Sequence, residues 1–200
     1  AHPDGTSFVS GDLNGQVCHW DTATGELVRT FDASALHTRK DSFLADVGGV
    51  RSLVFDQQGE LLACGGMTDA TSNAFCHGNP AILVLDWNQG ELRQTLRPQH
   101  TSDGPIKGLV FLSDGSLAGH AEKLNGEASL EFWRPDQPDS IHVIKRQSGF
   151  CLDIHPDGLQ LAAATFKING RFGNGRHAEQ DAYASHDGEI AIFSLCEKES

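Results

Sequence analysis

The stretch SGDLNGQVCHWDTATGE, which runs from Ser10 to Glu26, is the most informative part of the 200-residue chain. Its Asn14-Gly15 dipeptide favours a tight turn with positive φ and stands between two short runs that can form strands. Trp20-Asp21 ends the second run, and a further strand-like run begins just after Gly25. The stretch therefore predicts short antiparallel strands joined by tight turns.

The same pattern continues along the whole chain. Asp-Gly and Asn-Gly dipeptides separate runs of mostly about four to seven residues that are rich in Val, Ile, Leu and Phe. No run combines a sustained helical apolar period with helix caps, so little helix is expected and the predicted fold class is all-β. Examples of the predicted strands are 50–55, 61–65, 82–86, 106–111, 128–133, 151–155 and 190–195.

Four turn glycines define an internal repeat. Each follows Asp or Gln and precedes a short apolar strand, and their spacings are 54, 56 and 43 residues for Gly5, Gly59, Gly115 and Gly158. Four short antiparallel strands in about 40–45 residues, with insertions, are typical of a β-propeller blade. We therefore expect a partial propeller of about three and a half to four four-stranded antiparallel blades. The blades are predicted at 2–32 (incomplete), 49–97, 104–146 and 149–195 (incomplete).

The residues around Trp20-Asp21 resemble a WD-repeat motif, and the His-Pro-Asp-Gly turns at 2–5 and 155–158 resemble those of bacterial WD repeats. The resemblance implies that Ser10, Asp12 and Trp20 match three positions of the family's His–Asp–Ser/Thr–Trp hydrogen-bond tetrad, whose histidine would lie upstream of Ala1. Asp21 completes the pair that names the family. Later units carry Leu85-Asp86, Trp133-Arg134 and Phe193-Ser194 at this place. Residues expected to pack between blades are Trp20, Trp133, Phe55 and Phe111.

The first and last units lack strands, so their apolar faces need a cover. We expect one missing N-terminal propeller half to cover both, which would make the chain the C-terminal part of a propeller of about six to eight blades. The family resemblance favours seven. A homodimer fits less well, because one end lacks an inner strand and the other end lacks an outer one.

Two insertions, 67–80 and 167–187, interrupt corresponding places in the second and fourth units. Long loops on a rigid scaffold are where binding residues usually lie, although they are equally expected as tolerated surface insertions. The candidate interaction surface consists of Phe75, His77, Arg171, Phe172, Arg176 and Tyr183. Imidazole and carboxylate ligands that could gather around a divalent ion are His177, Glu179, Asp181 and His186, although their spacing matches no fixed metal motif.

Charge and composition narrow the function classes. The net charge of −12 repels phosphate backbones and anionic lipid, so neither nucleic acid nor membrane is expected as a partner. No catalytic constellation and no cofactor motif is present, and we expect neither. The predicted function is a non-catalytic protein-interaction scaffold. The alternative is an enzyme or a small-ligand or metal-binding propeller with its site at the channel mouth, under the two insertions.

The five cysteines show no C-x-x-C spacing and define no disulfide framework. Cys18, Cys64 and Cys151 lie in strand-like runs, where burial as a free thiol is expected. This cysteine usage favours a reducing, cytoplasmic location.

Overall fold

A computed structural model of the chain describes residues 1–73, 77–100, 103–121, 127–147, 149–167, 176–177, 182–183 and 187–195. The structure is 56% strand and 4% helix, which confirms the all-β prediction. The described helices are the short 3₁₀ segments η1 (Ser34–Leu36) and η2 (Asp41–Phe43). Among the described residues, no helix is long and apolar enough to cross a bilayer.

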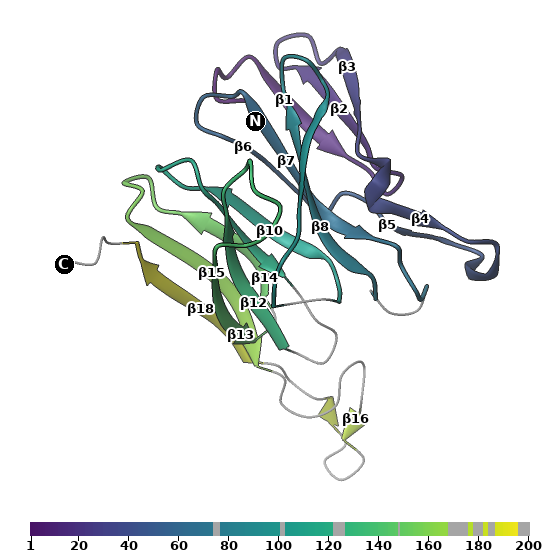
Figure 1. Cartoon of the computed structure of the whole chain (residues 1–200), viewed down its shortest axis with the longest axis vertical. Coiled ribbons are helices and arrows are strands. Elements are labelled where there is room, and N and C mark those ends of the chain that lie inside the picture. Colours follow the sequence, from purple (N-terminus) through teal and green to yellow (C-terminus); the bar gives the residue numbers. More distant parts are fainter. Residues whose placement is uncertain are drawn as a thin grey trace.

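Four antiparallel sheets follow one another along the chain, each with its strands in sequence order (Figure 1). The first contains β1 (Ser7–Gly11), β2 (Gln16–Asp21) and β3 (Leu27–Asp32). The second contains β6 (Ser52–Phe55), β7 (Leu61–Thr68), β8 (Asn79–Asp86) and β9 (Leu92–Leu96). The third contains β10 (Ile106–Phe111), β11 (Leu117–Ala121), β12 (Glu127–Trp133) and β13 (His142–Gln147). The fourth contains β14 (Gly149–Ile154), β15 (Gln160–Lys167) and β18 (Asp187–Ser194).

Two small hairpins lie outside these sheets. One pairs β4 (His37–Arg39) with β5 (Asp46–Gly48) in the connection between the first two sheets. The other pairs β16 (Arg176–His177) with β17 (Ala182–Tyr183). The sequence predicted neither hairpin, and the turn of the first contains no Asn-Gly or Asp-Gly dipeptide.

The strand register repeats from sheet to sheet. The residue at the Trp20 position stands opposite the second residue of the preceding strand in the first, second and fourth sheets, and opposite the first residue of that strand in the third. These pairs are Phe8 with Trp20, Leu62 with Leu85, Leu117 with Trp133, and Leu161 with Phe193. One pairing pattern therefore orients the same faces of all four sheets toward their neighbours.

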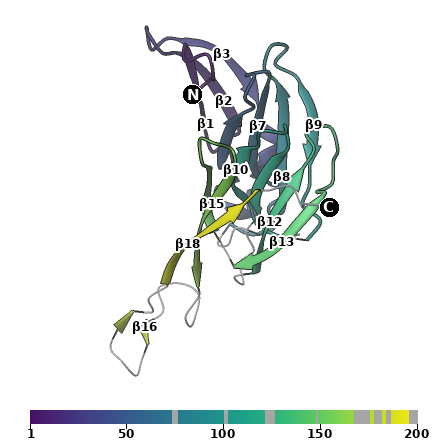
Figure 2. The same ribbon diagram turned by 90° about the vertical axis from the view of Figure 1, so that its left-hand side faces the viewer.

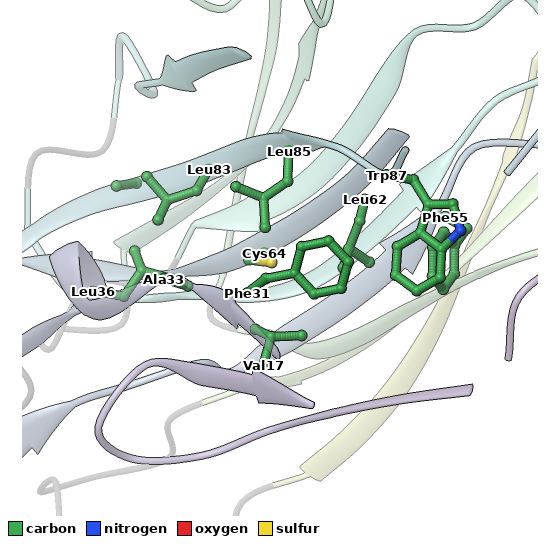
Figure 3. Packing of buried hydrophobic residues seen from close by; sticks show 11 residues of the cluster. Val17, Phe31, Ala33, Leu36, Phe55, Leu62, Cys64, Leu83, Leu85 and Trp87 are labelled. Carbon is green, nitrogen blue, oxygen red and sulfur yellow. The ribbon is translucent and has the colours of Figure 1, made fainter. Parts of the chain in front are cut away.

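The hydrophobic core lies between the sheets. Figure 3 shows the cluster between the first two sheets, where Phe31, Leu62 and Leu85 meet Phe55 and Trp87. A second cluster joins the second and third sheets and contains Trp133, which is fully buried, and Phe111. A third cluster joins Val110 and Leu130 to Leu152 and Leu161 of the fourth sheet. The predicted packing between sheets is thus observed for Phe55, Phe111 and Trp133.

Three side chains differ from the expectation of burial. Trp20 is partly exposed and stacks on Phe8, with ring centres 6.4 Å apart, because it lies in the first sheet and on the side away from the second. Cys151 is exposed and Cys18 is half-buried, whereas Cys64 is buried between the first two sheets. A strand-like run therefore did not reveal which side of the strand meets a neighbouring sheet.

The described sheets form a partial β-propeller that does not close into a ring. Large apolar side chains remain exposed on the outermost sheets, as expected from the sequence. On the first sheet they are Phe8, Leu27 and Val28, which are 40%, 50% and 55% exposed. On the fourth they are Ile190 and Ile192, on β18 at the edge seen in Figure 2.

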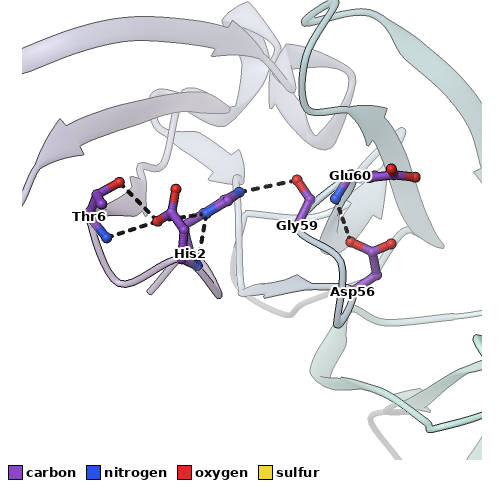
Figure 4. Close-up of polar contacts among 6 residues, drawn as sticks. His2, Thr6, Asp56, Gly59 and Glu60 are labelled. Atoms are coloured by element: carbon purple, nitrogen blue, oxygen red, sulfur yellow. Dashed lines mark hydrogen bonds and ion pairs between the residues drawn. The ribbon is translucent and has the colours of Figure 1, made fainter.

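Turns on one end of the strands join the first two sheets directly. His2 Nε2 lies within hydrogen-bond distance, 3.1 Å, of the Gly59 carbonyl oxygen (Figure 4). The Asp56 carboxylate accepts a hydrogen bond from the backbone N–H of Glu60 at 2.8 Å in the same turn. We call this end of the strands the turn face, because the repeated glycine turns lie there. The longer connections leave from the opposite end.

Candidate functional site

The loop face consists of the connections 33–51, 69–78 and 97–105, as far as the structure describes them. The second and fourth strands of one antiparallel sheet run in the same direction, so the connections that follow them leave from the same end. The segment 69–78 follows β7, and 97–105 follows β9. In the first, three-stranded sheet β3 pairs with β2 as β9 pairs with β8, so the segment 33–51 that follows β3 leaves from this same end. It contains the β4–β5 hairpin, which projects from the sheets in Figure 1.

Hydrogen bonds tie this hairpin to the insertion after β7. The Ala70 backbone N–H donates to Thr38 Oγ1 at 3.0 Å, and Lys40 Nζ donates to the Ala70 carbonyl oxygen at 2.7 Å. Asn73 Nδ2 donates to the carbonyl oxygen of Phe43, near the hairpin tip, at 2.6 Å. The two connections therefore form one hydrogen-bonded unit, although no local sequence signal indicates that they meet.

His77, one of the predicted interaction residues, lies on this face with its side chain 33% exposed. Its Nδ1 is 2.5 Å from Asp103 Oδ2, and the other carboxylate oxygen accepts the Gly78 backbone N–H at 3.0 Å. The Gly104 N–H donates to the Gly78 carbonyl oxygen at 2.9 Å. Hydrogen bonds thus join the insertion 69–78 to the linker 97–105, as they also join it to the β4–β5 hairpin.

The base of the insertion is polar and ordered. Asp69 adopts a left-handed backbone with φ of 53°, and its carboxylate accepts hydrogen bonds from Thr68 Oγ1 and Asn79 Nδ2. These hydrogen bonds lower the pKa of Asp69, so the group stays ionised at neutral pH. Arg97 Nη1 donates to Thr68 Oγ1 at 3.0 Å and to the Pro80 carbonyl oxygen at 3.2 Å.

A buried carboxylate fixes the start of the 97–105 linker. Glu131, on β12, is fully buried and accepts the backbone N–H groups of Gln99 at 2.8 Å and His100 at 3.2 Å. The hydroxyls of Ser129 and Ser140 donate to the same carboxylate at 2.6 Å and 2.5 Å. The sequence reasoning missed Glu131, and the only signal was a charged residue inside an apolar strand, between Leu130 and Phe132.

The predicted motif residues of the first unit lie on β1, β2 and their turns. Trp20 Nε1 donates to Ser10 Oγ at 2.9 Å. The Asp12 carboxylate accepts the backbone N–H groups of Asn14 and Gln16, and Asp21 caps the next turn through the N–H of Thr24. The histidine of the expected tetrad stays a prediction.

The remaining predicted residues are only partly placed. The backbones of Arg176 and His177 pair with those of Tyr183 and Ala182 in the β16–β17 hairpin. The described residues contain no group of three or more His, Cys, Asp or Glu that could hold a metal ion. The metal and surface assignments in the second insertion therefore stay predictions. Residues that lie outside the described part are Phe75, Arg171, Phe172, Glu179, Asp181 and His186.

Successive antiparallel sheets of up to four strands, packed face to face, define the chain as a partial β-propeller. Residues 1–21 match the family described as "WD domain, G-beta repeat". The match and the four-stranded sheets together fit a segment of a WD-repeat propeller. Such repeats generally mediate protein–protein interaction and are typically non-enzymatic. A search of curated proteins finds no match.

Proposed function

We propose that this chain is a non-catalytic interaction scaffold whose protein partner docks on the loop face. The observation that carries the proposal is the set of hydrogen bonds that join three connections, which follow β3, β7 and β9, into one surface. Thr38 and Lys40 form hydrogen bonds with the Ala70 backbone. His77 and Gly78 form hydrogen bonds with the Asp103 carboxylate. A surface ordered before binding loses little conformational entropy when the partner docks.

Removal of the insertion tests this proposal. Replacing residues 69–78 by an Asn-Gly turn would join β7 and β8 directly, because Thr68 pairs with Asn79 and this dipeptide suits a two-residue hairpin. The matched control is Gln57→Ala with Gln58→Ala, two exposed residues in the turn before β7, on the turn face. We expect affinity capture from source cells to lose partners with the shortened loop and to keep them with the control. Unchanged partners in both variants would contradict the proposal.

We also propose that further propeller blades cover the exposed apolar faces of the first and fourth sheets. Phe8, Val28, Ile190 and Ile192 supply apolar area that other sheets of the array bury against a neighbour. Bare faces of this kind promote association. The 200 residues alone are therefore expected to self-associate in sedimentation analysis, and a stable, soluble monomer would contradict this part of the proposal.

A further inference from the structure

Two bare faces remain at the two ends of the series of sheets. The fourth sheet exposes Ile190 and Ile192 on β18, at 71% and 58%. The first sheet exposes Phe8 at 40% and leaves Trp20 partly exposed on the side away from the second sheet. The first and fourth sheets lie at opposite ends of the array in Figure 1. Because the strand register repeats, each bare position has counterparts in the other sheets.

The counterparts of Ile190 are all buried. Ile190 stands three residues before the residue at the Trp20 position, where the other sheets carry Val17, Ile82 and Leu130. Each of these three side chains is fully buried in the cluster that joins its sheet to the following one. The face with Ile190 is therefore the side of the sheet on which a following sheet packs.

The structure also shows what covers such a face. In each internal interface the following sheet contributes the register pair that contains its residue at the Trp20 position. These covering pairs are Leu62 with Leu85, Leu117 with Trp133, and Leu161 with Phe193. The corresponding pair of the first sheet is Phe8 with Trp20, and no preceding sheet lies on it in the described part of the chain. One chain thus carries both halves of its repeated interface, one at each end.

A histidine turn adds a polar contact to this interface. His2 Nε2 lies 3.1 Å from the Gly59 carbonyl oxygen of the following sheet, and the ring packs edge-on against Phe55, with ring centres 4.9 Å apart. His155 begins the second His-Pro-Asp-Gly turn, whose backbone closes with the same hydrogen bonds as the first. Its side chain is 56% exposed, and Nε2 has no hydrogen-bond partner among the described residues. His155 therefore presents the group with which His2 contacts a following sheet.

The first sheet offers the matching acceptor. Gly5 takes the place of Gly59 in its turn, and the two glycines have positive φ angles of 73° and 70°. In the part of the chain that the structure describes, no group donates to the Gly5 carbonyl oxygen. The open end of the fourth sheet therefore lacks an acceptor, and the open end of the first sheet holds one at the corresponding place.

We propose that the fourth sheet of one copy of this chain docks on the first sheet of a second copy, in the arrangement that joins the first and second sheets within the chain. The Trp20 face of the second copy then covers Ile190. His155 Nε2 lies against the Gly5 carbonyl oxygen of that copy. The inference rests on the proposal that further blades cover the bare faces, and it names a second copy of the chain as their source.

The missing strands do not oppose this contact. The objection to a homodimer, that one end lacks an inner strand and the other an outer one, concerns strand pairing within one sheet. Packing of one face on another exchanges no strand. A head-to-tail contact forms a ring if its rotation closes. Two copies with four sheets each supply eight, and propellers typically contain about four to eight, so we expect a dimer joined by two such contacts.

The first experiment measures the association and locates it. Sedimentation equilibrium of the purified 200-residue chain should show a dimer that dissociates on dilution. Benzoylphenylalanine, a photo-crosslinking amino acid, is placed at position 190 or, as the control, at position 92. Leu92 is also exposed, at 52%, but belongs to the second sheet, which packs against a neighbour on both faces.

Irradiation of a mixture of unlabelled and heavy-isotope-labelled copies identifies crosslinks between two chains. Position 190 should crosslink to residues 7–21 of the second copy, and position 92 should not. A monomer at every concentration would overturn both this inference and the proposed cover by further blades. A dimer in which position 190 crosslinks elsewhere, or not at all, would overturn the inference and leave the proposed function in place.

The second experiment measures the apolar part of the contact. Ile190→Ser combined with Ile192→Ser should raise the dissociation constant of the dimer by at least roughly tenfold, because two side chains lose their transfer out of water. Leu92→Ser is the control and should leave the constant unchanged. Both variants should fold as the wild type does, since the replaced side chains are exposed in the single chain. Wild-type association in the double variant would overturn the inference.

The third experiment compares the two histidines. His155→Ala should weaken the dimer severalfold and leave the thermal midpoint of the diluted, monomeric chain unchanged, because its contact lies between copies. His2→Ala should lower that midpoint by about 2–4 °C, because its contact lies within the chain. Unchanged association of His155→Ala, or a fall in its monomer midpoint equal to that of His2→Ala, would overturn the docking arrangement.

Discussion

The guanidinium of Arg29 lies 4.5 Å from the centre of the Trp87 ring, and its Nη2 donates a hydrogen bond of 2.5 Å to the Trp87 carbonyl oxygen. Arg29 belongs to β3 of the first sheet, whereas Trp87 directly follows β8 of the second. Trp87 also packs against Phe31 and Phe55, with ring centres 4.9 Å and 4.8 Å away. Trp87 thus makes both aromatic and polar contacts across the interface between the first and second sheets.

Truncation of this residue should weaken that interface strongly. Trp87→Ala removes a side chain that is 6% exposed, and losses for buried Trp are about 3–5 kcal/mol in the free energy of unfolding. Trp20→Ala is the control, because its partly exposed ring should lose no more than about 1–2 kcal/mol. Denaturant unfolding measures both, and equal losses would contradict the packing described here.

Loss of the buried carboxylate should free the linker between the second and third sheets. Glu131→Ala removes the carboxylate acceptor of the Gln99 and His100 N–H groups, and Gln99 keeps a contact to Ser140 Oγ at 3.1 Å. The unfolding free energy should fall by about 1–3 kcal/mol. Hydrogen exchange at these two amides should accelerate. Ser129→Ala removes one donor and should have a much smaller effect, so fast exchange in both variants would point to a different cause.

Acid should destabilise the interface between the third and fourth sheets through His120. This histidine is fully buried, and neither ring nitrogen has a hydrogen-bond partner among the described residues. Burial, with a smaller contribution from the charge of Lys107, lowers its pKa from 6.5 to about 4. The unfolded chain therefore binds the proton more readily, and stability is lost as pH falls from about 6.5 to 4.

The loss from His120 alone should reach roughly 3 kcal/mol at the acid end of this range. His120→Leu should remove that part of the pH dependence of the unfolding free energy. The exposed His155 serves as control, and His155→Leu should keep the slope of the wild type. An unchanged slope in His120→Leu would show that the buried imidazole is not responsible.

Thiol chemistry should separate the cysteines by burial. Burial raises the pKa of Cys64 to about 12, so its thiol stays protonated and unreactive at neutral pH. Cys151 is exposed and should react quickly with iodoacetamide in the native protein. Peptide mass spectrometry reads both sites, and denaturant should abolish the difference. Rapid native modification of Cys64 would contradict its place between the first two sheets.

The turns and strands were predictable because their signals are local. Asn14-Gly15 and the repeated Asp-Gly turns place Gly where the backbone φ is positive, a conformation that favours Gly. The short apolar runs between these turns form strands. The repeat then follows from the spacing of the glycines, and Trp20 and Trp133 stand at corresponding places in two of its units. Local residue patterns were therefore enough to predict the turns, the strands and the repeat.

The loop face was not predictable from local signals. The β4–β5 hairpin turns at Leu44, a residue with no turn preference, and contacts with Asn73 and Ala70 from a different connection help to hold it. Glu131 accepts hydrogen bonds from residues about thirty positions away, which no local pattern reveals. His77 was singled out from its loop, but its partner Asp103 belongs to another linker and was unforeseen.

Hydrogen exchange of the full chain, with and without a partner protein recovered by affinity capture, tests the central claim most directly. We predict that binding protects amides in 37–48 and 69–73, where the hairpin and the insertion meet. Protection confined to the opposite ends of the strands, at 56–60 and 112–116, would contradict the claim that partners dock on the loop face.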